Sequence, residues 1–224
     1  MTGLSMPHVL LHGLPPQRMS CTPVWVSTRS YHGRMGTRDR ILDAAEQAIR
    51  EFGIAGATTR RIAQRAACSE ALLYKHFAGK EEIVLAVLLE RSPALGPALA
   101  KLRSSVGEGD LDAHLVEFTG KTLEFYTRAA AVAGGVLGDP PLMAGFRSML
   151  AKADLGPHLP IEALAEILRA ERQAGRIAAG VDPGAAASLL MGACFHRASL
   201  THFVDLPDDD ATWAAAVVDT LFRR

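Results

Sequence analysis

The chain has few of the residues that build catalytic, metal-binding or disulfide-stabilised sites. Only three of its 224 residues are cysteines, and Cys21, Cys68 and Cys194 form neither a CxxC pair nor a disulfide framework. A Gly-rich phosphate loop, a nucleophile elbow and a recognisably spaced pair of carboxylates are also missing. These absences argue against an enzyme and against a structural zinc protein, and they favour a reducing, cytoplasmic setting.

Long hydrophobic runs and β-forming segments are scarce as well. No uninterrupted apolar stretch approaches the roughly 18 residues of a membrane span, so no membrane helix is expected. Aromatic residues make up 6% of the chain, β-branched runs are rare, and Ala, Leu, Glu and Arg dominate the long segments. The sequence therefore predicts an all-α protein, long enough to bury a substantial core.

The formal net charge of zero hides two oppositely charged regions. Residues 34–80 hold nine Lys and Arg against five Asp and Glu, whereas residues 81–224 hold thirteen against nineteen. A basic N-terminal module on an acidic body is the pattern expected of a protein that binds a polyanion through the module.

Residues 1–34 have no sustained helical period, and prolines and glycines interrupt them. Their apolar run is too short for a secretory signal, and we expect a flexible leader. Met35 is a candidate natural start, because the helical pattern begins directly after it. An alternative is a basic arm that uses Arg29 and Arg34 in the minor groove of DNA.

The stretch 58–80, TTRRIAQRAACSEALLYKHFAGK, has the pattern of two short helices joined by a tight turn. Thr58 is placed to cap a helix over residues 59–66, and Ser69 to cap a helix over residues 70–77. Two helices in this arrangement are typical of a helix-turn-helix, which places its second helix in the major groove of DNA.

Flanking helices complete this module. A helix over residues 37–52 precedes the pair and ends at Gly53, and Lys80 begins a further helix that extends to about residue 91. Ala67 lies in the turn, where a positive φ would strain it slightly.

Residues 37–80 resemble the N-terminal domain of the TetR family of transcriptional regulators. TRDRILDAA, TTRRIAQRA and SEALLYKHF, followed by a Gly-Lys step, match the residue types of that family at many positions and in order. Ala67 stands where the family usually has Gly, and Cys68 where Val or Ile usually fills the core. The resemblance implies an all-α fold, with a three-helix helix-turn-helix DNA-binding domain at residues 35–82 and a helical ligand-binding and dimerisation domain at residues 83–224.

The resemblance also implies which residues contact DNA. Those expected at phosphates are Thr59, Arg60, Tyr74, His76 and Lys80, and those expected at bases are Glu70, Ala71, Tyr74 and Lys75. A donor such as Lys75 suits the O6 and N7 edge of guanine, Glu70 could accept from a cytosine amine, and Ala71 could meet a thymine methyl. The plainer alternative is that Tyr74 and His76 are ordinary surface residues and that Glu70 only favours the start of its helix.

The rest of the chain has the punctuation of a helical body. The expected helices lie near residues 97–104, 111–133, 140–153, 160–174, 183–203 and 208–223. A small apolar effector is the expected ligand, and the candidate ligand-binding residues are His114, Phe118, Met143, Phe146 and Met149. The alternative is that these side chains are only core, with Met filling irregular gaps.

A metal site or other cofactor is not predicted. Cys194, His196, His202 and Asp205 lie near one another in sequence, but Cys194 and His196 diverge by about 200° on a helix and His202 lies nearly two turns further on. These residues therefore do not share one face.

The last two expected helices, near residues 183–203 and 208–223, carry stripes of mostly small residues. The first stripe is Ala186, Leu190, Ala193 and Arg197 with Leu189 and Leu200, and the second is Trp213, Ala216, Val217, Thr220 and Leu221. By the resemblance, these helices would pair with their copies in a homodimer. The alternative is that the stripes form an intramolecular core.

The sequence thus predicts a ligand-responsive transcriptional regulator in the cytoplasm. We expect a dimeric repressor that binds a pseudo-palindromic, double-stranded DNA operator and is released by the effector through movement of the helix that begins at Lys80. The alternative is a helical interaction or metal-sensing protein without effector-driven DNA release.

Overall fold

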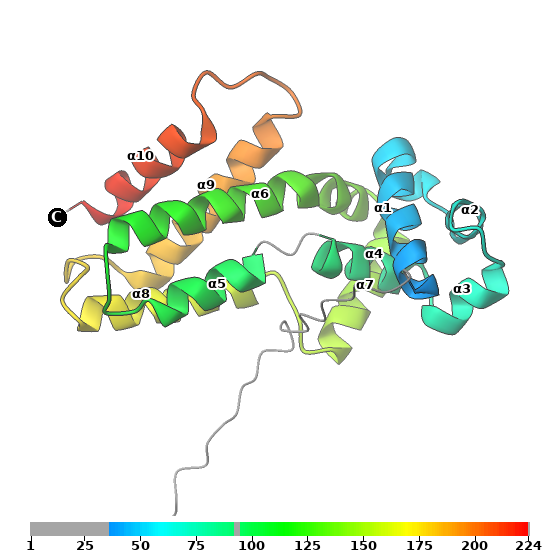
Figure 1. The fold of residues 1–224 in the computed structure, drawn as a ribbon, viewed down its shortest axis with the longest axis horizontal. Helices are drawn as coiled ribbons and strands as arrows, with labels where there is room; N and C mark the ends of the chain where they lie inside the picture. The colour runs from blue at the N-terminus through cyan, green and yellow to red at the C-terminus, as the bar shows by residue number, and fades with distance from the viewer. Residues whose placement is uncertain (1–35, 92–94, 224) are drawn as a thin grey trace, which may run out of the picture.

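The computed structural model describes residues 36–91 and 95–223, which fold into ten α-helices (Figure 1). In chain order these are α1 (Thr37–Gly56), α2 (Thr59–Arg65), α3 (Glu70–His76), α4 (Lys80–Glu90), α5 (Leu95–Ser104), α6 (Leu111–Leu137), α7 (Pro140–Lys152), α8 (Leu159–Gln173), α9 (Pro183–Leu200) and α10 (Asp210–Phe222). No strand occurs within the two described segments, and the expected all-α fold is confirmed.

Side-chain caps fix the starts of the two short helices, α2 and α3. Thr58 Oγ1 accepts a hydrogen bond of 3.2 Å from the backbone N–H of Arg61, and Ser69 Oγ accepts one of 3.1 Å from that of Leu72. Both caps are the ones predicted from the sequence. Such caps satisfy backbone donors that a helix start would otherwise leave unpaired, and each stabilises its helix by about 1 kcal/mol.

Two backbone positions shape the connections around these helices. Gly53 has a φ of 66° and a ψ of 175°, so it interrupts the regular helix where expected, and one further turn continues to Gly56. Ala67, in the turn between α2 and α3, has a φ of 52°. This left-handed conformation costs an alanine about 1 kcal/mol, so the expected strain is present.

Aspartates cap most of the longer helices. The caps of α6, α7, α9 and α10 are Asp110, Asp139, Asp182 and Asp209. One boundary differs clearly from the expectation: α6 continues past residue 133 to Leu137 and carries Gly134 and Gly135 inside it. Burial of Val132 and Val136 in this last part offsets the low helix propensity of the two glycines.

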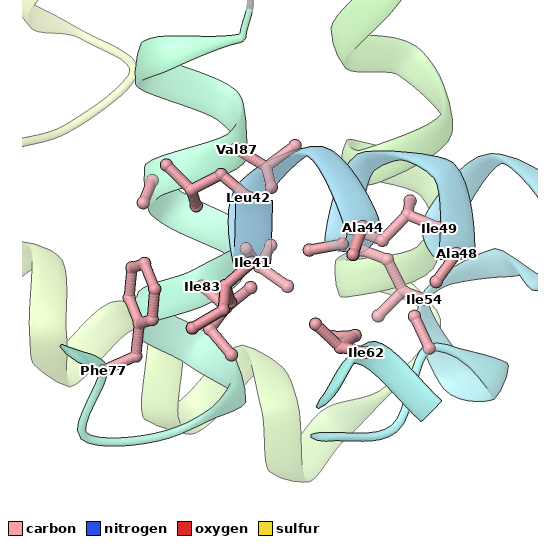
Figure 2. Packing of buried hydrophobic residues seen from close by; sticks show 14 of the residues in the cluster. Ile41, Leu42, Ala44, Ala48, Ile49, Ile54, Ile62, Phe77, Ile83 and Val87 are labelled. Atoms are coloured by element: carbon pink, nitrogen blue, oxygen red, sulfur yellow. The ribbon is translucent and has the colours of Figure 1, made fainter. Parts of the chain in front are cut away.

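The buried apolar side chains form two clusters. The N-terminal cluster combines α1–α4 with the end of α6 and the start of α7. Its largest fully buried members are Ile41, Leu42, Ile54, Ile62, Phe77 and Ile83, which Figure 2 shows, together with Leu73. The body cluster combines α5, α6, α8, α9 and α10, and its largest fully buried members are Leu115, Leu164, Leu168, Leu190 and Met191.

Helix α6 joins these two parts. It runs along the long axis of the molecule, with α1, α2 and α3 at one end and α8, α9 and α10 toward the other (Figure 1). Its Leu115 and Phe118 lie in the body cluster, and its Val132 and Val136 lie in the N-terminal cluster. The N-terminal cluster also includes Ile83 and Val87 of α4, so its packing continues beyond residue 82.

The predicted leader, residues 1–34, and the candidate start at Met35 lie outside the described residues. Among the described helices, no single one has the length and hydropathy of a membrane span. Only α4 and α5 taken together reach that length and hydropathy, and the two helices are bent by 43° relative to each other.

Candidate DNA-binding surface and ligand region

Helices α2 and α3 bury one face each and present the opposite face to solvent. Ile62 and Ala63 of α2 and Leu73 of α3 are buried, and Phe77 follows α3 into the same cluster. The residues predicted to contact DNA are therefore turned outward. The exposed residues among them are Arg60, Glu70, Ala71, Tyr74 and Lys75, and the partly exposed ones are Thr59, His76 and Lys80.

A hydrogen bond links the two helices on this outer side. The hydroxyl of Tyr74, whose residue is 51% exposed, donates to Thr59 Oγ1 over 3.3 Å. Two groups predicted to hold phosphates, one from each helix, are thereby brought side by side at the surface.

Cations elsewhere in the N-terminal module are engaged within the chain. Arg61 donates to the carbonyl of Gly56 over 2.5 Å, and its guanidinium lies 4.2 Å from the ring centre of Phe52. Arg65 forms an ion pair with Glu51 and also lies over Phe52. These two arginines of α2 are therefore held against the end of α1.

Three cations predicted to contact DNA have no such engagement. Within residues 36–91 and 95–223, the side chains of Arg60, Lys75 and Lys80 make neither an ion pair nor a hydrogen bond to the protein. Positive charge that no described residue neutralises is thus present on α2, on α3 and at the start of α4. Such charge is available to replace the counterions of a phosphate backbone.

Ion pairs fasten α4 to the first turns of α1. Arg38 donates to both carboxylate oxygens of Glu90 over 2.6 Å, and the hydrogen bond with Glu90 raises the pKa of Arg38. Arg91 Nε donates to Asp43 over 2.7 Å, and its Nη2 donates to the carbonyl of Asp39 over 3.1 Å. Together with the buried core between the two helices, these contacts make α1 and α4 one packing unit.

The five candidate ligand-binding residues do not meet in one place. His114 and Phe118 border a cavity of about 30 Å³ between α5 and α6, and His114 Nδ1 is buried without a hydrogen-bond partner in the described residues. Met143 and Phe146 instead pack on the N-terminal cluster, and Met149 is half-buried on α7. A cavity of this size holds about one water molecule, whereas small-molecule pockets usually exceed about 300 Å³.

A larger open cavity of about 450 Å³ was not expected from the sequence. Its apolar floor is Leu111, Val218 and Phe222, and charged residues form its rim. The remaining lining residues are Gly109, Asp110, Asp112, Arg176, Asp219 and Arg223. They come from three distant segments, and no motif marks them, so sequence reasoning had no signal from which to find this cavity.

Comparisons with known proteins match this architecture. A model of the family described as "Bacterial regulatory proteins, tetR family" matches residues 41–87, which cover most of α1–α4. The HTH-type transcriptional regulator UidR of Escherichia coli strain K12 is 30% identical over 158 residues, which span 69% of this chain and 76% of UidR. The chain belongs to the TetR family.

Other relatives of this TetR-family regulator match over shorter or more divergent stretches. YvkB of Bacillus subtilis is 39% identical over 75 residues, which span 37% of that protein. The structure of Salmonella enterica GusR is 25% identical and superimposes with a TM-score of 0.61, over 84% of this chain and 96% of GusR. FadR of Bacillus subtilis, solved in complex with stearoyl-CoA, is 19% identical with a TM-score of 0.59, over 82% of this chain and 97% of FadR, and supports the fold alone.

The structure corrects half of the stripe predicted for dimerisation on the helix near residues 183–203. Ala186, Leu190 and Arg197 of α9 are buried inside the chain. Arg197 donates to Asp210 over 2.9 Å and lies over the ring of Trp213, so it holds α10 against α9. Spacing alone cannot tell which of two apolar faces points inward, and the predicted stripe combined residues of both faces.

The open face of α9 includes Leu189, which belongs to the predicted stripe, and Phe195, which does not. Leu189 is 59% exposed and Phe195 is 41% exposed, with Gly192 between them on the same side. On α10, Ala216 and Thr220 of the predicted stripe are exposed, and Trp213, Val217 and Leu221 are half-buried.

Cys194 is a buried core residue in this family member. Its Sγ lies 3.7 Å from the carbonyl oxygen of Thr119, and burial raises the pKa of its thiol to about 12. The thiolate that metal binding requires is therefore strongly disfavoured. Within residues 36–91 and 95–223, no three His, Cys, Asp or Glu side chains are grouped so that they could hold a metal ion.

Proposed function

We propose that this TetR-family regulator is a dimeric repressor that binds a pseudo-palindromic DNA operator and releases it when a small apolar effector binds the body. The observation that carries the proposal is that Arg60 of α2, Lys75 of α3 and Lys80 of α4 have no ion pair or hydrogen-bond partner for their side chains among the described residues. The hydrogen bond from Tyr74 to Thr59 joins α2 and α3 on their solvent-facing side. On this view, Thr59, Arg60, Tyr74, His76 and Lys80 hold phosphates, and Glu70, Ala71, Tyr74 and Lys75 read bases. The protein acts by binding in the cytoplasm and not as an enzyme.

Dimerisation would supply the second half of the binding site. One α3 reaches only a few base pairs, whereas two copies about 34 Å apart read half-sites separated by one turn of DNA. Leu189 and Phe195 form an exposed apolar face on α9, and Ala216 and Thr220 on α10 allow close approach. An isologous interface of these two helices with their copies would bury that face.

The effector would enter the body and separate its helices. Stearoyl-CoA, the molecule bound to the FadR homologue, carries a long apolar chain, which supports an apolar ligand for this fold. The body cluster between α5, α6 and α8 offers apolar lining, with His114 and Phe118 at its edge. Met143, Phe146 and Met149 would contribute only if the site extends to α7.

Footprinting on the DNA that flanks the protein's own gene tests DNA binding and repression. We expect protection of two half-sites related by approximate two-fold symmetry, binding that weakens with added salt, and higher expression from that promoter when the gene is deleted. Absence of any protected site at low salt would contradict the proposal.

Sedimentation at micromolar concentration tests the dimer. We expect a dimer for the natural chain and a monomer for Leu189→Asp, because a buried carboxylate without a partner strongly disfavours an interface. The matched control is Leu137→Asp, since Leu137 is also exposed but lies at the end of α6. A natural chain that sediments as a monomer would refute the dimer.

A further inference from the structure

A close contact joins α6 to the end of α1. A Cβ atom built on Gly135 would lie 2.7 Å from Cβ and 3.0 Å from Cγ1 of Ile54. Cβ atoms essentially never approach that closely, so only glycine allows the backbone of α6 to lie against this side chain. Ile54 is buried and lies only a few residues before Thr58, the cap of α2.

The position of Gly135 near the end of α6 allows this contact to link the body to the N-terminal module. Helix α6 is continuous from Leu111 to Leu137, and at 1.5 Å per residue it is about 40 Å long. Its first half is packed in the body cluster, and its last turns are packed in the N-terminal cluster. If α6 moves as a rigid helix, a displacement of its backbone at Leu115 or Phe118 also displaces Gly135 relative to Ile54.

A second glycine makes a looser contact between α7 and α4. A Cβ on Gly145 would lie 3.0 Å from Cγ and 3.1 Å from Oε1 of Glu81. A glutamate side chain can change its rotamer, so this contact yields more easily than the one at Ile54.

Helix α4 is not free to act as an independent lever. The pairs Arg38–Glu90 and Arg91–Asp43 hold its C-terminal end against α1. Ile83 and Val87 pack with Ile41 and Leu42 along the same seam (Figure 2). Any signal that moves α4 must move α1 with it, and α6 meets α1 at Ile54.

We propose that the contact between Gly135 and Ile54 is the joint through which the body sets the position of α2 and α3, and that both are positioning residues for operator binding. The inference rests on the proposed function. It assigns the transmission of the effector signal to α6 and the α1–α2 connection, in place of an independent movement of α4. Two joints in a dimer then fix the spacing of the two recognition helices.

A glycine pair within α6 supplies a matched test. Gly135→Ala forces α6 away from Ile54, whereas a Cβ on the neighbouring Gly134 meets no atom within 4 Å. Both substitutions raise helix propensity equally, so the difference between them reports the contact. Each variant is measured by electrophoretic mobility shift on the footprinted operator and on the same DNA with one half-site scrambled.

We expect Gly134→Ala to bind like the natural chain and Gly135→Ala to lose about tenfold or more in affinity for the full operator. Binding to the single half-site should remain within about twofold, because the DNA-contacting face itself is unchanged. A role limited to folding of the N-terminal module would weaken both DNAs alike. Equal affinity of the two alanine variants for the full operator, or equal losses on both DNAs, would overturn the inference.

The double variant Ile54→Ala, Gly135→Ala keeps the test decisive if Gly135→Ala folds poorly. Removing the larger side chain makes room for the new methyl group, so we expect partial recovery of full-operator affinity over Gly135→Ala. No recovery in a double variant that melts like the natural chain would also refute the joint. Failure of the natural chain to bind any flanking DNA would instead refute the proposed function.

Discussion

The N-terminal module and the body are both packed helices, but they differ in where the residues proposed to bind a partner lie. On α2 and α3, burial of Ile62 and Leu73 turns the other face toward solvent, and the side chains proposed to contact DNA lie on that face. In the body cluster, the candidate ligand residue Phe118 is itself buried. We therefore expect the surface for DNA to exist before its partner arrives, whereas the site for the proposed apolar effector would have to be opened by the effector.

This difference explains why the two parts respond differently to one kind of change. A side chain lost from beneath α3 removes the support of a preformed surface. A side chain lost from the body cluster only enlarges the space in which an effector is expected.

The largest expected effect compares two buried phenylalanines. Phe77→Ala and Phe118→Ala should each lower the free energy of unfolding by about 3–5 kcal/mol, because each deletes a fully packed ring. Only Phe77→Ala should also weaken operator binding by the folded protein, since Phe77 anchors the end of α3. Denaturant titration monitored by circular dichroism gives the stability, and mobility shifts at low temperature give the affinity. An equal loss of operator affinity in both variants would break the comparison.

The same difference sets how much could be predicted from the sequence. The caps Thr58 and Ser69 and the two short helices that they begin were predicted correctly, because capping and helical period are local properties. The stripe predicted on α9 mixed its two faces, because Leu189 and Leu190 are adjacent leucines and either could point inward. The contact of Gly135 with Ile54 joins segments far apart in the chain, and its glycine gives no sequence signal.

The next effect in size tests the DNA-facing surface alone. Tyr74→Ala combined with Lys75→Ala should weaken operator binding by about 2–4 kcal/mol, because it removes the hydroxyl that donates to Thr59 and a cation that has no partner among the described residues. Stability should change little, since both side chains are exposed. The control is Lys152→Ala, an exposed lysine at the end of α7. Undiminished affinity of the double variant in fluorescence anisotropy would remove α3 as the recognition helix.

A smaller effect on DNA affinity should distinguish Arg60, which has no ion pair among the described residues, from an arginine that is paired within the chain. Arg60→Ala should weaken binding to every DNA sequence by about 1 kcal/mol and reduce the slope of log K against log salt by about 1 per subunit, because one phosphate contact is lost. Arg50→Ala is the control, since Arg50 is exposed on α1 and paired with Glu46 over 2.7 Å. Its salt slope should match that of the natural chain. Equal slopes for the two variants, measured between about 50 and 200 mM salt, would show that Arg60 makes no phosphate contact.

The smallest effect concerns Cys194, which is fully buried in the body, in contrast to the exposed side chains of α2 and α3. Burial raises the pKa of the folded thiol from its ordinary value near 9 to about 12. The folded state therefore holds a proton that the unfolded chain releases, so this contribution to stability is complete below about pH 9 and declines as the pH rises toward 12. Between pH 8 and pH 9.5 the loss should stay below about 1 kcal/mol. Denaturant titrations of the natural chain and of Cys194→Ala across this pH range isolate the contribution of the thiol to the free energy of unfolding, because only the natural chain carries this thiol. Parallel pH dependences for the two proteins would mean that Cys194 is accessible to water, and the body cluster would then be open even without an effector.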